Sequence, residues 1–181
     1  LLVTTPGGDR LQPIAIPSDA QLGFWGQWAL VELRSDWTVG GRTWPAGSLL
    51  AGDADALLAA TDEDGMPPLQ ALFTPSPGRS LAGHGATASR VLLSVLDNVA
   101  GRLEACRPDA AAPGGWVRED LAAPFPGTLS LQPLHDEELA GDPLAEAFLL
   151  GYTDFLTPDS LLLGHTDGRP LQRLKSRGSH F

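Results

Sequence analysis

The sequence predicts an all-β protein built from about three consecutive four-stranded antiparallel units. Glycine (21 residues) and proline (16 residues) punctuate all 181 residues, so sustained helical periodicity has little room. Short apolar runs lie between these turn residues, which is typical of strands. The same order of strands then recurs, with first strands starting at Trp28, Val91 and Phe148, 63 and 57 residues apart.

Each predicted unit holds an apolar strand, a turn that carries an aspartate, a second apolar strand and a more amphipathic strand. A fourth strand comes from the segment before each repeat. The one helix-like stretch, 53–60, spans about two turns, so we place it as an excursion between strands. Gly40-Gly41 marks a turn. With the fourth strand of each unit first, the expected strands are 11–16, 28–33, 48–53 and 69–73; 81–83, 90–96, 101–106 and 115–121; and 128–134, 147–152, 160–165 and 170–175.

Repeats of this length with four strands each are typical of propeller blades. A β-sandwich made of the same hairpins is the alternative that periodicity leaves open. We expect one partial β-propeller domain over 1–181. Both ends of the sequence resemble the ends of an excised segment, so we expect a fragment of a longer protein. The approximate blades are 11–73, 79–121 and 127–175, and 176–181 is the expected start of a linker.

Charge and composition exclude several classes of partner. The 22 acidic and 12 basic residues give a formal charge of −10, which repels phosphate backbones and anionic lipid surfaces, so we expect no nucleic acid and no membrane partner. No apolar run approaches the roughly 18 residues of a membrane span, and no secretory signal is visible. A single cysteine excludes a disulfide framework within the chain. We expect a cytoplasmic location; a periplasmic or secreted one stays open because the true N-terminus is expected to be absent.

The sequence contains no residue that we assign as catalytic, cofactor-binding or metal-binding. The chain has no nucleophile elbow, no P-loop and no dinucleotide fingerprint, and no two histidines have helical metal-ligand spacing. Ser48 begins a strand, and the glycines around His84 form too short a cluster to hold a phosphate. The acidic segment 135–138 is interpreted as a solvated loop, and 62–65 lacks the alternating ligands of a calcium loop.

Other distinctive residues are assigned to packing or turns. Cys106 ends an apolar strand and is predicted to be a buried, inert thiol. The four tryptophans within 25–44 are predicted to pack between sheets rather than form a carbohydrate platform. The turn aspartates are predicted to stabilise Asx-type turns rather than to act as catalytic acids. They are Asp36, Asp97 and Asp154.

Several stretches resemble the β-propeller region of prolyl oligopeptidase-family serine peptidases, most closely a bacterial branch of that family. The most specific is YTDFLTPDSL at 152–161, which in the family belongs to a late blade. The resemblance covers about 13–181. The other stretches are WALVELRSDW at 28–37, GGRTWPAGSLLA at 40–51, LFTP at 72–75 and VLDNV at 95–99.

The resemblance implies a seven-bladed propeller that caps an α/β-hydrolase domain and filters its substrates by size. It implies hydrolysis of short peptides, typically after proline, by a Ser–His–Asp triad in the hydrolase domain, without a cofactor. No position here matches the triad motifs, so this chain alone is expected to be inactive. The expected partners are short peptides, the hydrolase domain of the same chain, and a second copy that self-associates through exposed blade faces. The alternative is a stand-alone propeller or sandwich binding module without catalytic activity.

Overall fold

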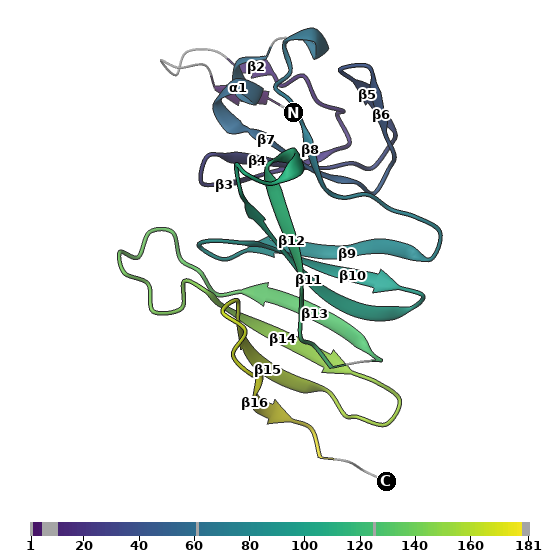
Figure 1. Cartoon of the computed structure of the whole chain (residues 1–181), viewed down its shortest axis with the longest axis vertical. Helices are drawn as coiled ribbons and strands as arrows, with labels where there is room; N and C mark the ends of the chain where they lie inside the picture. Colours follow the sequence, from purple (N-terminus) through teal and green to yellow (C-terminus); the bar gives the residue numbers. More distant parts are fainter. Residues whose placement is uncertain (1, 5–10, 61, 125, 179–181) are drawn as a thin grey trace. The chain divides into compact units, whose positions relative to one another are not determined.

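The computed structural model describes residues 2–4, 11–60, 62–124 and 126–178. The chain divides into two compact units, Leu1–Pro75 and Ser76–Phe181. All pairings between the described strands are antiparallel, and they form three four-stranded and two two-stranded sheets (Figure 1). No helix among the described residues is long and apolar enough to cross a membrane.

The first unit is built on one four-stranded meander with the strand order β3-β4-β7-β8. Its interruptions are a two-stranded hairpin between β4 and β7, and the short helix α1 with a 3-10 turn between β7 and β8. A separate hairpin pairs β1 with β2. The bounds are β1 Leu2–Thr4, β2 Leu11–Pro13, β3 Gln21–Trp25, β4 Trp28–Glu32, β5 Trp37–Val39, β6 Arg42–Trp44, β7 Leu49–Asp53, α1 Ala54–Ala59, η1 Glu63–Gly65 and β8 Gln70–Phe73.

Turn chemistry in the first unit explains where its elements begin and end. Gly40 and Gly41 have φ values of 58° and 72°, so they form the two-residue turn with positive φ that joins β5 to β6. The carboxylate of Asp53 accepts the N–H of Ala56 at 2.8 Å and caps α1. The core of this unit is made by the buried side chains Ile14, Ile16, Ala20, Ala29, Val31, Leu33, Trp37, Val39, Trp44, Leu50 and Leu57.

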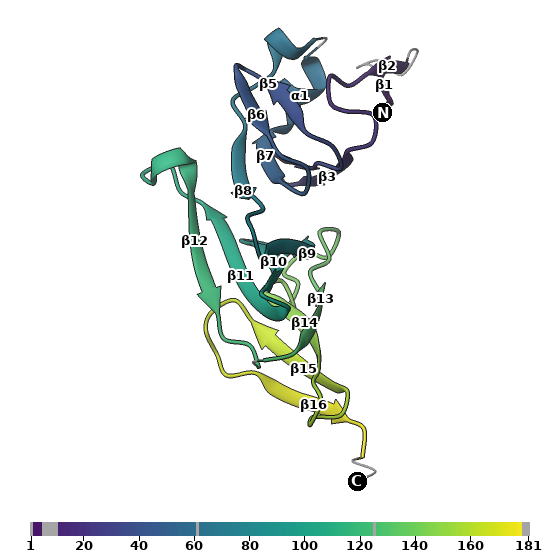
Figure 2. The ribbon, with the colours of Figure 1, turned by 90° about the vertical axis from the view of Figure 1, so that its right-hand side faces the viewer.

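The second unit holds two four-stranded meanders, β9-β10-β11-β12 and β13-β14-β15-β16 (Figure 2). Tight turns or loops join neighbouring strands, and each strand pairs with the next in sequence within its own sheet. The bounds are β9 Arg79–Ala86, β10 Val91–Asp97, β11 Ala100–Pro108, η2 Pro113–Gly115, β12 Trp116–Leu121, β13 Thr128–Pro133, β14 Ala147–Thr153, β15 Ser160–His165 and β16 Gln172–Ser176.

The two sheets of the second unit pack face to face, with β13 against β9, β10 and β11. Close approach depends on glycine at two points. A Cβ on Gly85 would lie 2.6 Å from Pro133 Cγ, and one on Gly101 would lie 2.6 Å from Leu129 Cγ. The Gly101 N–H also donates to the Gly127 carbonyl at 2.7 Å. The core between the sheets is Leu92, Leu103, Ala105, Leu129, Phe148, Leu150, Tyr152 and Leu162.

The structure confirms the all-β prediction and the three four-stranded antiparallel sheets, with α-helix confined to Ala54–Ala59 among the described residues. The prediction that 11–16 supplies the fourth strand of the first unit is wrong. Leu11–Pro13 pairs with Leu2–Thr4 instead, and the fourth strand is β3. Its two-residue connection to β4, with Gly26 at a φ of 52°, favours this local pairing. The hairpin of β5 and β6 was predicted only as a turn at Gly40-Gly41.

Candidate functional site

A cluster of polar side chains joins the two sheets of the second unit where three of its loops meet. We call it the inter-sheet polar cluster; it consists of Thr87, Ser89, Arg90, Glu119, Glu146 and Thr166. The carboxylate Oε2 of Glu146 accepts a hydrogen bond from Thr87 Oγ1 at 3.0 Å and another from Thr166 Oγ1 at 2.6 Å. Both threonines are buried. One carboxylate therefore ties the β9–β10 loop to the β15–β16 loop.

Main-chain hydrogen bonds reinforce this junction. The Ala88 N–H donates to the Ala145 carbonyl at 2.8 Å, and the Thr166 N–H donates to the Glu146 carbonyl at 3.0 Å. Because these groups are positioned by backbone, the threonine hydroxyls are held where a carboxylate can accept from both.

Arg90 is the cationic residue of the cluster. Its Nε donates to Glu119 Oε1 at 2.8 Å, and its Nη1 donates to Ser89 Oγ at 3.0 Å and to Thr166 Oγ1 at 3.3 Å. Burial alone would raise the pKa of Glu146. The hydrogen bonds from Thr166, Ser89 and Thr87, together with the charge of Arg90, outweigh burial and lower that pKa. Glu146 is therefore an ionised acceptor at neutral pH and not a proton donor.

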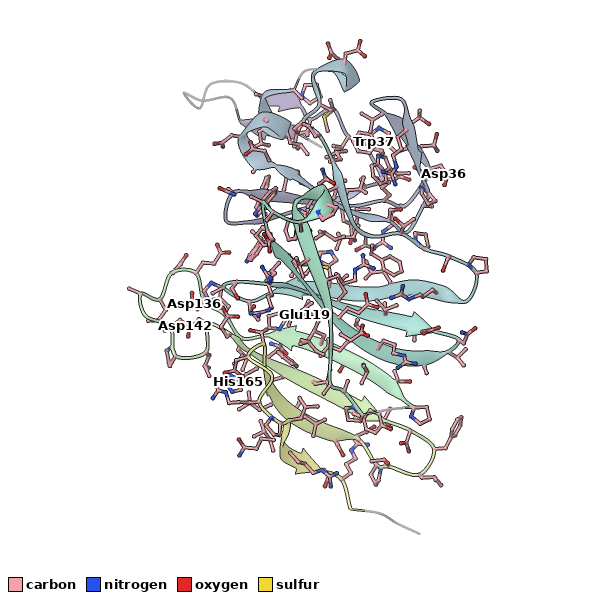
Figure 3. The ribbon with its side chains drawn as sticks, in the orientation of Figure 1. Asp36, Trp37, Glu119, Asp136, Asp142 and His165 are labelled. Atoms are coloured by element: carbon pink, nitrogen blue, oxygen red, sulfur yellow. The ribbon has the colours of Figure 1, made fainter. Side chains whose placement is uncertain are left out.

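The acidic segment 135–138 lies in the loop between β13 and β14, as predicted (Figure 3). Asp142 organises this loop: its Oδ2 lies 3.1 Å from His135 Nδ1 and accepts the Asp136 N–H, while its Oδ1 accepts the Leu144 N–H. The backbone donors of Asp136 and Leu144, with a smaller contribution from His135, lower the pKa of Asp142. Within the described part of the chain, the hydrogen bonds of His135 stop at Asp142, so the pair holds a loop and activates no nucleophile.

Other residues singled out by sequence lie apart from one another. Ser48 is fully buried, which keeps substrates from its hydroxyl. Cys106 is also buried, as predicted, and burial raises the pKa of its thiol. His84 lies on β9 opposite Leu93, and His165 Nδ1 lies 3.3 Å from Arg169 Nη2. His180 lies outside the described residues, as does the end of the expected linker at 179–181.

The predicted packing role of the tryptophans is supported, whereas the predicted Asx-type turn is found at one of the three aspartates, Asp154. Asp36 accepts the Ala46 N–H at 2.8 Å, and Asp154 accepts the N–H groups of the β14–β15 turn. Asp97 instead accepts from the side chain of Asn98 at 3.0 Å. Three of the four clustered tryptophans are buried, which supports packing over a carbohydrate platform; they are Trp25, Trp37 and Trp44.

The described residues contain no group of three or more histidine, cysteine or acidic side chains that could hold a metal ion. The segment 62–65 forms a 3-10 turn in which Asp62 Oδ1 accepts the Gly65 N–H at 2.9 Å.

Comparison with known proteins gives relatives that are peptidases. No family model matches the chain. An uncharacterized peptidase of Sinorhizobium fredii is 31% identical over 160 residues, which is 88% of this chain and 20% of that protein. An uncharacterized peptidase of Rickettsia prowazekii is 36% identical over 104 residues, which is 57% of this chain and 14% of that protein.

A solved structure is similar over almost the whole chain. The post-proline cleaving enzyme of Rickettsia typhi matches with a TM-score of 0.77 and 26% identity, over 98% of this chain and 24% of that one. These matches confirm the resemblance to the prolyl oligopeptidase family. The likeness and the three meander sheets are consistent with a propeller-like fold. The chain spans a quarter or less of the length of each relative.

Two features of this chain were not predicted from its sequence. The first is the inter-sheet polar cluster, whose members are distant in the sequence and follow no motif; Thr87 and Glu146, for example, are 59 residues apart. The second is the pairing of Arg42 with Trp44 on β6. The second had a usable signal, because residues i and i+2 of a strand lie on the same face.

Proposed function

We propose that this chain forms part of the propeller of a prolyl oligopeptidase-like serine peptidase and gates the entry of short peptides to its active site. The likeness that covers 98% of the chain and 24% of a post-proline cleaving enzyme carries this proposal. The relatives named as peptidases support the same class of reaction. The substrates of the whole protein are then short peptides cleaved after proline.

In this proposal the chemistry belongs to a hydrolase domain outside the described residues. A serine hydroxyl attacks the carbonyl carbon of the proline residue, a histidine takes its proton and returns it to the leaving amine, and an aspartate orients the histidine. Water then hydrolyses the acyl-enzyme. The chain described here contributes walls that admit a thin, extended peptide and exclude a folded protein.

Gating of this kind requires neighbouring sheets that do not separate. The inter-sheet polar cluster and the close contacts at Gly85 and Gly101 support such a role, because each fixes one sheet of the second unit against the next. An ionised carboxylate shared by two buried hydroxyls is costly to pull apart, since Thr166 would lose its acceptor and Thr87 would keep only the Arg90 carbonyl.

The first test is activity. The isolated chain should neither cleave a chromogenic peptide that contains proline nor react with a fluorophosphonate probe, since no catalytic residue is assigned to it. The protein expressed from the complete reading frame should do both, and should cleave after proline in preference to alanine. Stoichiometric labelling of a serine in the isolated chain would contradict the proposal.

The second test is size selection in the complete protein. Glu146→Ala should raise cleavage of long peptides relative to a short chromogenic peptide, because the sheets can part more easily. Glu137→Ala, on an exposed part of the 134–146 loop, is the control. Equal size selection in both variants and in the natural sequence would contradict gating by this region while leaving the peptidase assignment intact.

A further inference from the structure

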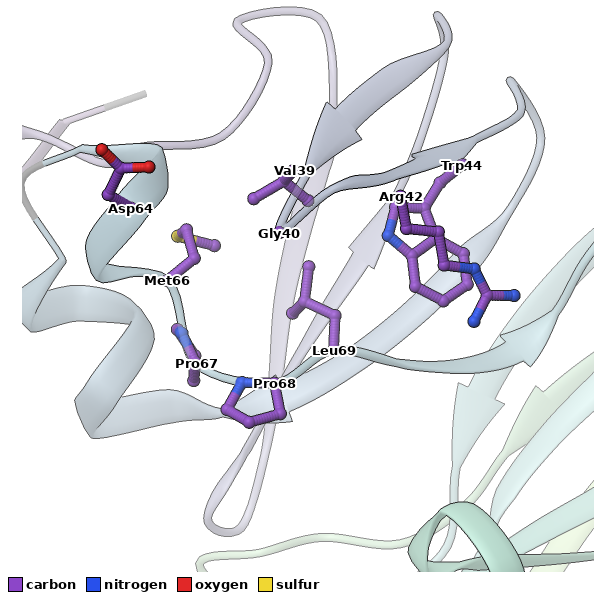
Figure 4. Close-up of a pocket in the computed structure, with 9 residues that line it drawn as sticks. All are labelled: Val39, Gly40, Arg42, Trp44, Asp64, Met66, Pro67, Pro68 and Leu69. Carbon is purple, nitrogen blue, oxygen red and sulfur yellow. The ribbon is translucent and has the colours of Figure 1, made fainter.

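An open pocket of about 370 Å³ lies in the first unit, between the hairpin of β5 and β6 and the segment 64–69 that precedes β8. Most of the residues that line it are apolar, and Figure 4 shows Val39, Met66 and Leu69 between its two ends. Its volume lies within the range of small-molecule sites. The pocket therefore offers apolar contact for one or two side chains of a ligand.

The two ends of the pocket carry opposite charges. Arg42 stands at one end with Trp44, and Asp64 stands at the other end beyond Met66 (Figure 4). An apolar lining between a cation and an anion matches a ligand that is apolar in its middle and charged at both ends. A short peptide with free termini and an apolar side chain has this pattern.

Arg42 is the residue that points to the ligand most directly. Its guanidinium carbon lies 3.6 Å from the ring centroid of Trp44, which is buried, so stacking fixes the planar group in place. The chain has 22 acidic residues, yet none among those described lies within ion-pair distance (4.0 Å) of Arg42. By contrast, Arg34 of the same unit pairs with Glu32 at 3.2 Å. A fixed guanidinium with its donors open is suited to an incoming carboxylate.

We propose that this pocket binds the C-terminal carboxylate of a short peptide whose last side chain is apolar. The carboxylate pairs with Arg42, and the last side chain packs on Val39, Met66 and Leu69. Asp64 lies at the end where the amino terminus of a very short peptide would reach. This proposal rests on the residues of the pocket and holds whether or not the whole protein is a peptidase. It therefore does not depend on the proposed function.

The test is an NMR titration of the isotopically labelled chain with the tripeptide Ala-Ala-Leu, as the free acid and as the C-terminal amide. We expect saturable shifts of the Gly40 and Leu69 amides and of the Trp44 indole with the acid. We expect binding at least about tenfold weaker with the amide, because the amide lacks the charge that Arg42 recognises. Shifts that gather elsewhere, equal binding of the two forms, or no saturation would overturn the proposal.

Variants of two arginines and one further ligand test which groups recognise the peptide. Arg42→Gln should weaken binding of the acid to the level of the amide, and Arg42→Lys should retain part of the affinity because it keeps the charge but loses the planar fork. Arg34→Gln is the matched control and should bind as the natural sequence does. Unchanged shifts outside the pocket verify that each variant is folded. Hexanoate, an apolar carboxylate without a peptide bond, should bind more weakly than the tripeptide; equal affinity would overturn the assignment to peptides.

Discussion

Thr87 and Glu146 lie 59 residues apart in the sequence and share a 3.0 Å hydrogen bond that joins the two sheets of the second unit. The same carboxylate oxygen accepts from Thr166, so the loops of both sheets converge on one acceptor. Because both threonines are buried, water cannot replace the carboxylate without opening the junction. The packing of these sheets therefore depends on polar complementarity as well as on the apolar core.

Replacing Glu146 with alanine should lower the free energy of unfolding by about 1–3 kcal/mol, because it leaves the buried Thr166 hydroxyl without its acceptor and the buried Thr87 hydroxyl with only the Arg90 carbonyl at 3.3 Å. Denaturant unfolding measures the loss. Glu137→Ala, on the exposed part of the same loop, should change stability by less than about 0.5 kcal/mol. Equal losses in the two variants would contradict the role assigned to Glu146.

Glu146 should also give the protein an acid-sensitive component of stability. Its pKa in the folded chain lies below the ordinary value of 4.5, so the stabilisation is fully present above pH 4.5 and is lost as pH falls through the lower, folded value. Glu146→Gln removes the titrating group, so its unfolding midpoint should decline less steeply below pH 4.5. Thermal unfolding of both proteins over this range measures the difference; parallel curves would contradict the assignment.

Tyr152 is the single tyrosine of the chain, so its phenolate can be titrated without interference from another tyrosine. A hydrogen bond to the Asp154 carboxylate, together with burial and the charge of that carboxylate, raises the pKa of Tyr152 to about 12. The same contact, with the N–H groups of Leu156 and Thr157, lowers the pKa of Asp154 to about 2. Ultraviolet absorbance should therefore show little phenolate formation near pH 10.

Asp154→Asn should return the phenolate transition toward pH 10, because the amide carries no charge to oppose ionisation. Asp159→Asn, at an exposed aspartate of the same loop, is the matched control and should leave the transition near 12. Circular dichroism at each pH verifies that the chain remains folded. A transition near 10 in the natural sequence would show that the Tyr152–Asp154 contact does not persist in solution.

A single methyl group added at Gly85 should loosen the contact between the two sheets. Its Cβ would lie 2.6 Å from Pro133 Cγ and 2.8 Å from Pro133 Cδ, and a proline ring has little freedom to move away. Gly85→Ala should therefore destabilise the chain by about 1–3 kcal/mol. Gly83→Ala, two residues earlier on the same strand, has no atom within 4 Å of the new Cβ and should be nearly neutral. Calorimetry of the two variants compares them directly.

Most strands were predictable because they are apolar runs between turn residues, as in β10, β14 and β15. The wrong assignment of 11–16 as the fourth strand of the first unit came from the same rule. Residues 11–16 are apolar enough to suggest a strand of the sheet, whereas β3 contains a glycine and has an exposed Phe24 and Gln21. Its place in the sheet is decided by the turn at Gly26, not by apolarity. The inter-sheet polar cluster was not predictable, because threonine, arginine and glutamate at distant positions carry no periodicity.

The outward face of the last sheet should make the chain self-associate. Leu149, Leu161 and Leu163 are cross-strand or diagonal neighbours on the face opposite the buried Leu150 and Leu162. Leu161 is 36% exposed. A sheet face of this kind presents several hundred Å² of surface, and at roughly 25 cal/mol per Å² its apolar part would contribute several kcal/mol before the cost of association.

A second copy of the chain is the predicted occupant of this face under the conditions of the experiment. The net charge of −10 opposes association, but salt screens that repulsion over about 8–10 Å, so dimerisation should tighten as ionic strength rises. Leu161→Asp should weaken the dimer because it places a charge in the middle of the face. Leu156→Asp is the matched control: Leu156 is 89% exposed but lies on the β14–β15 loop, away from the face. Light scattering on a size-exclusion column distinguishes the outcomes, and a monomer of 19.0 kDa at high protein and high salt concentration would contradict this prediction.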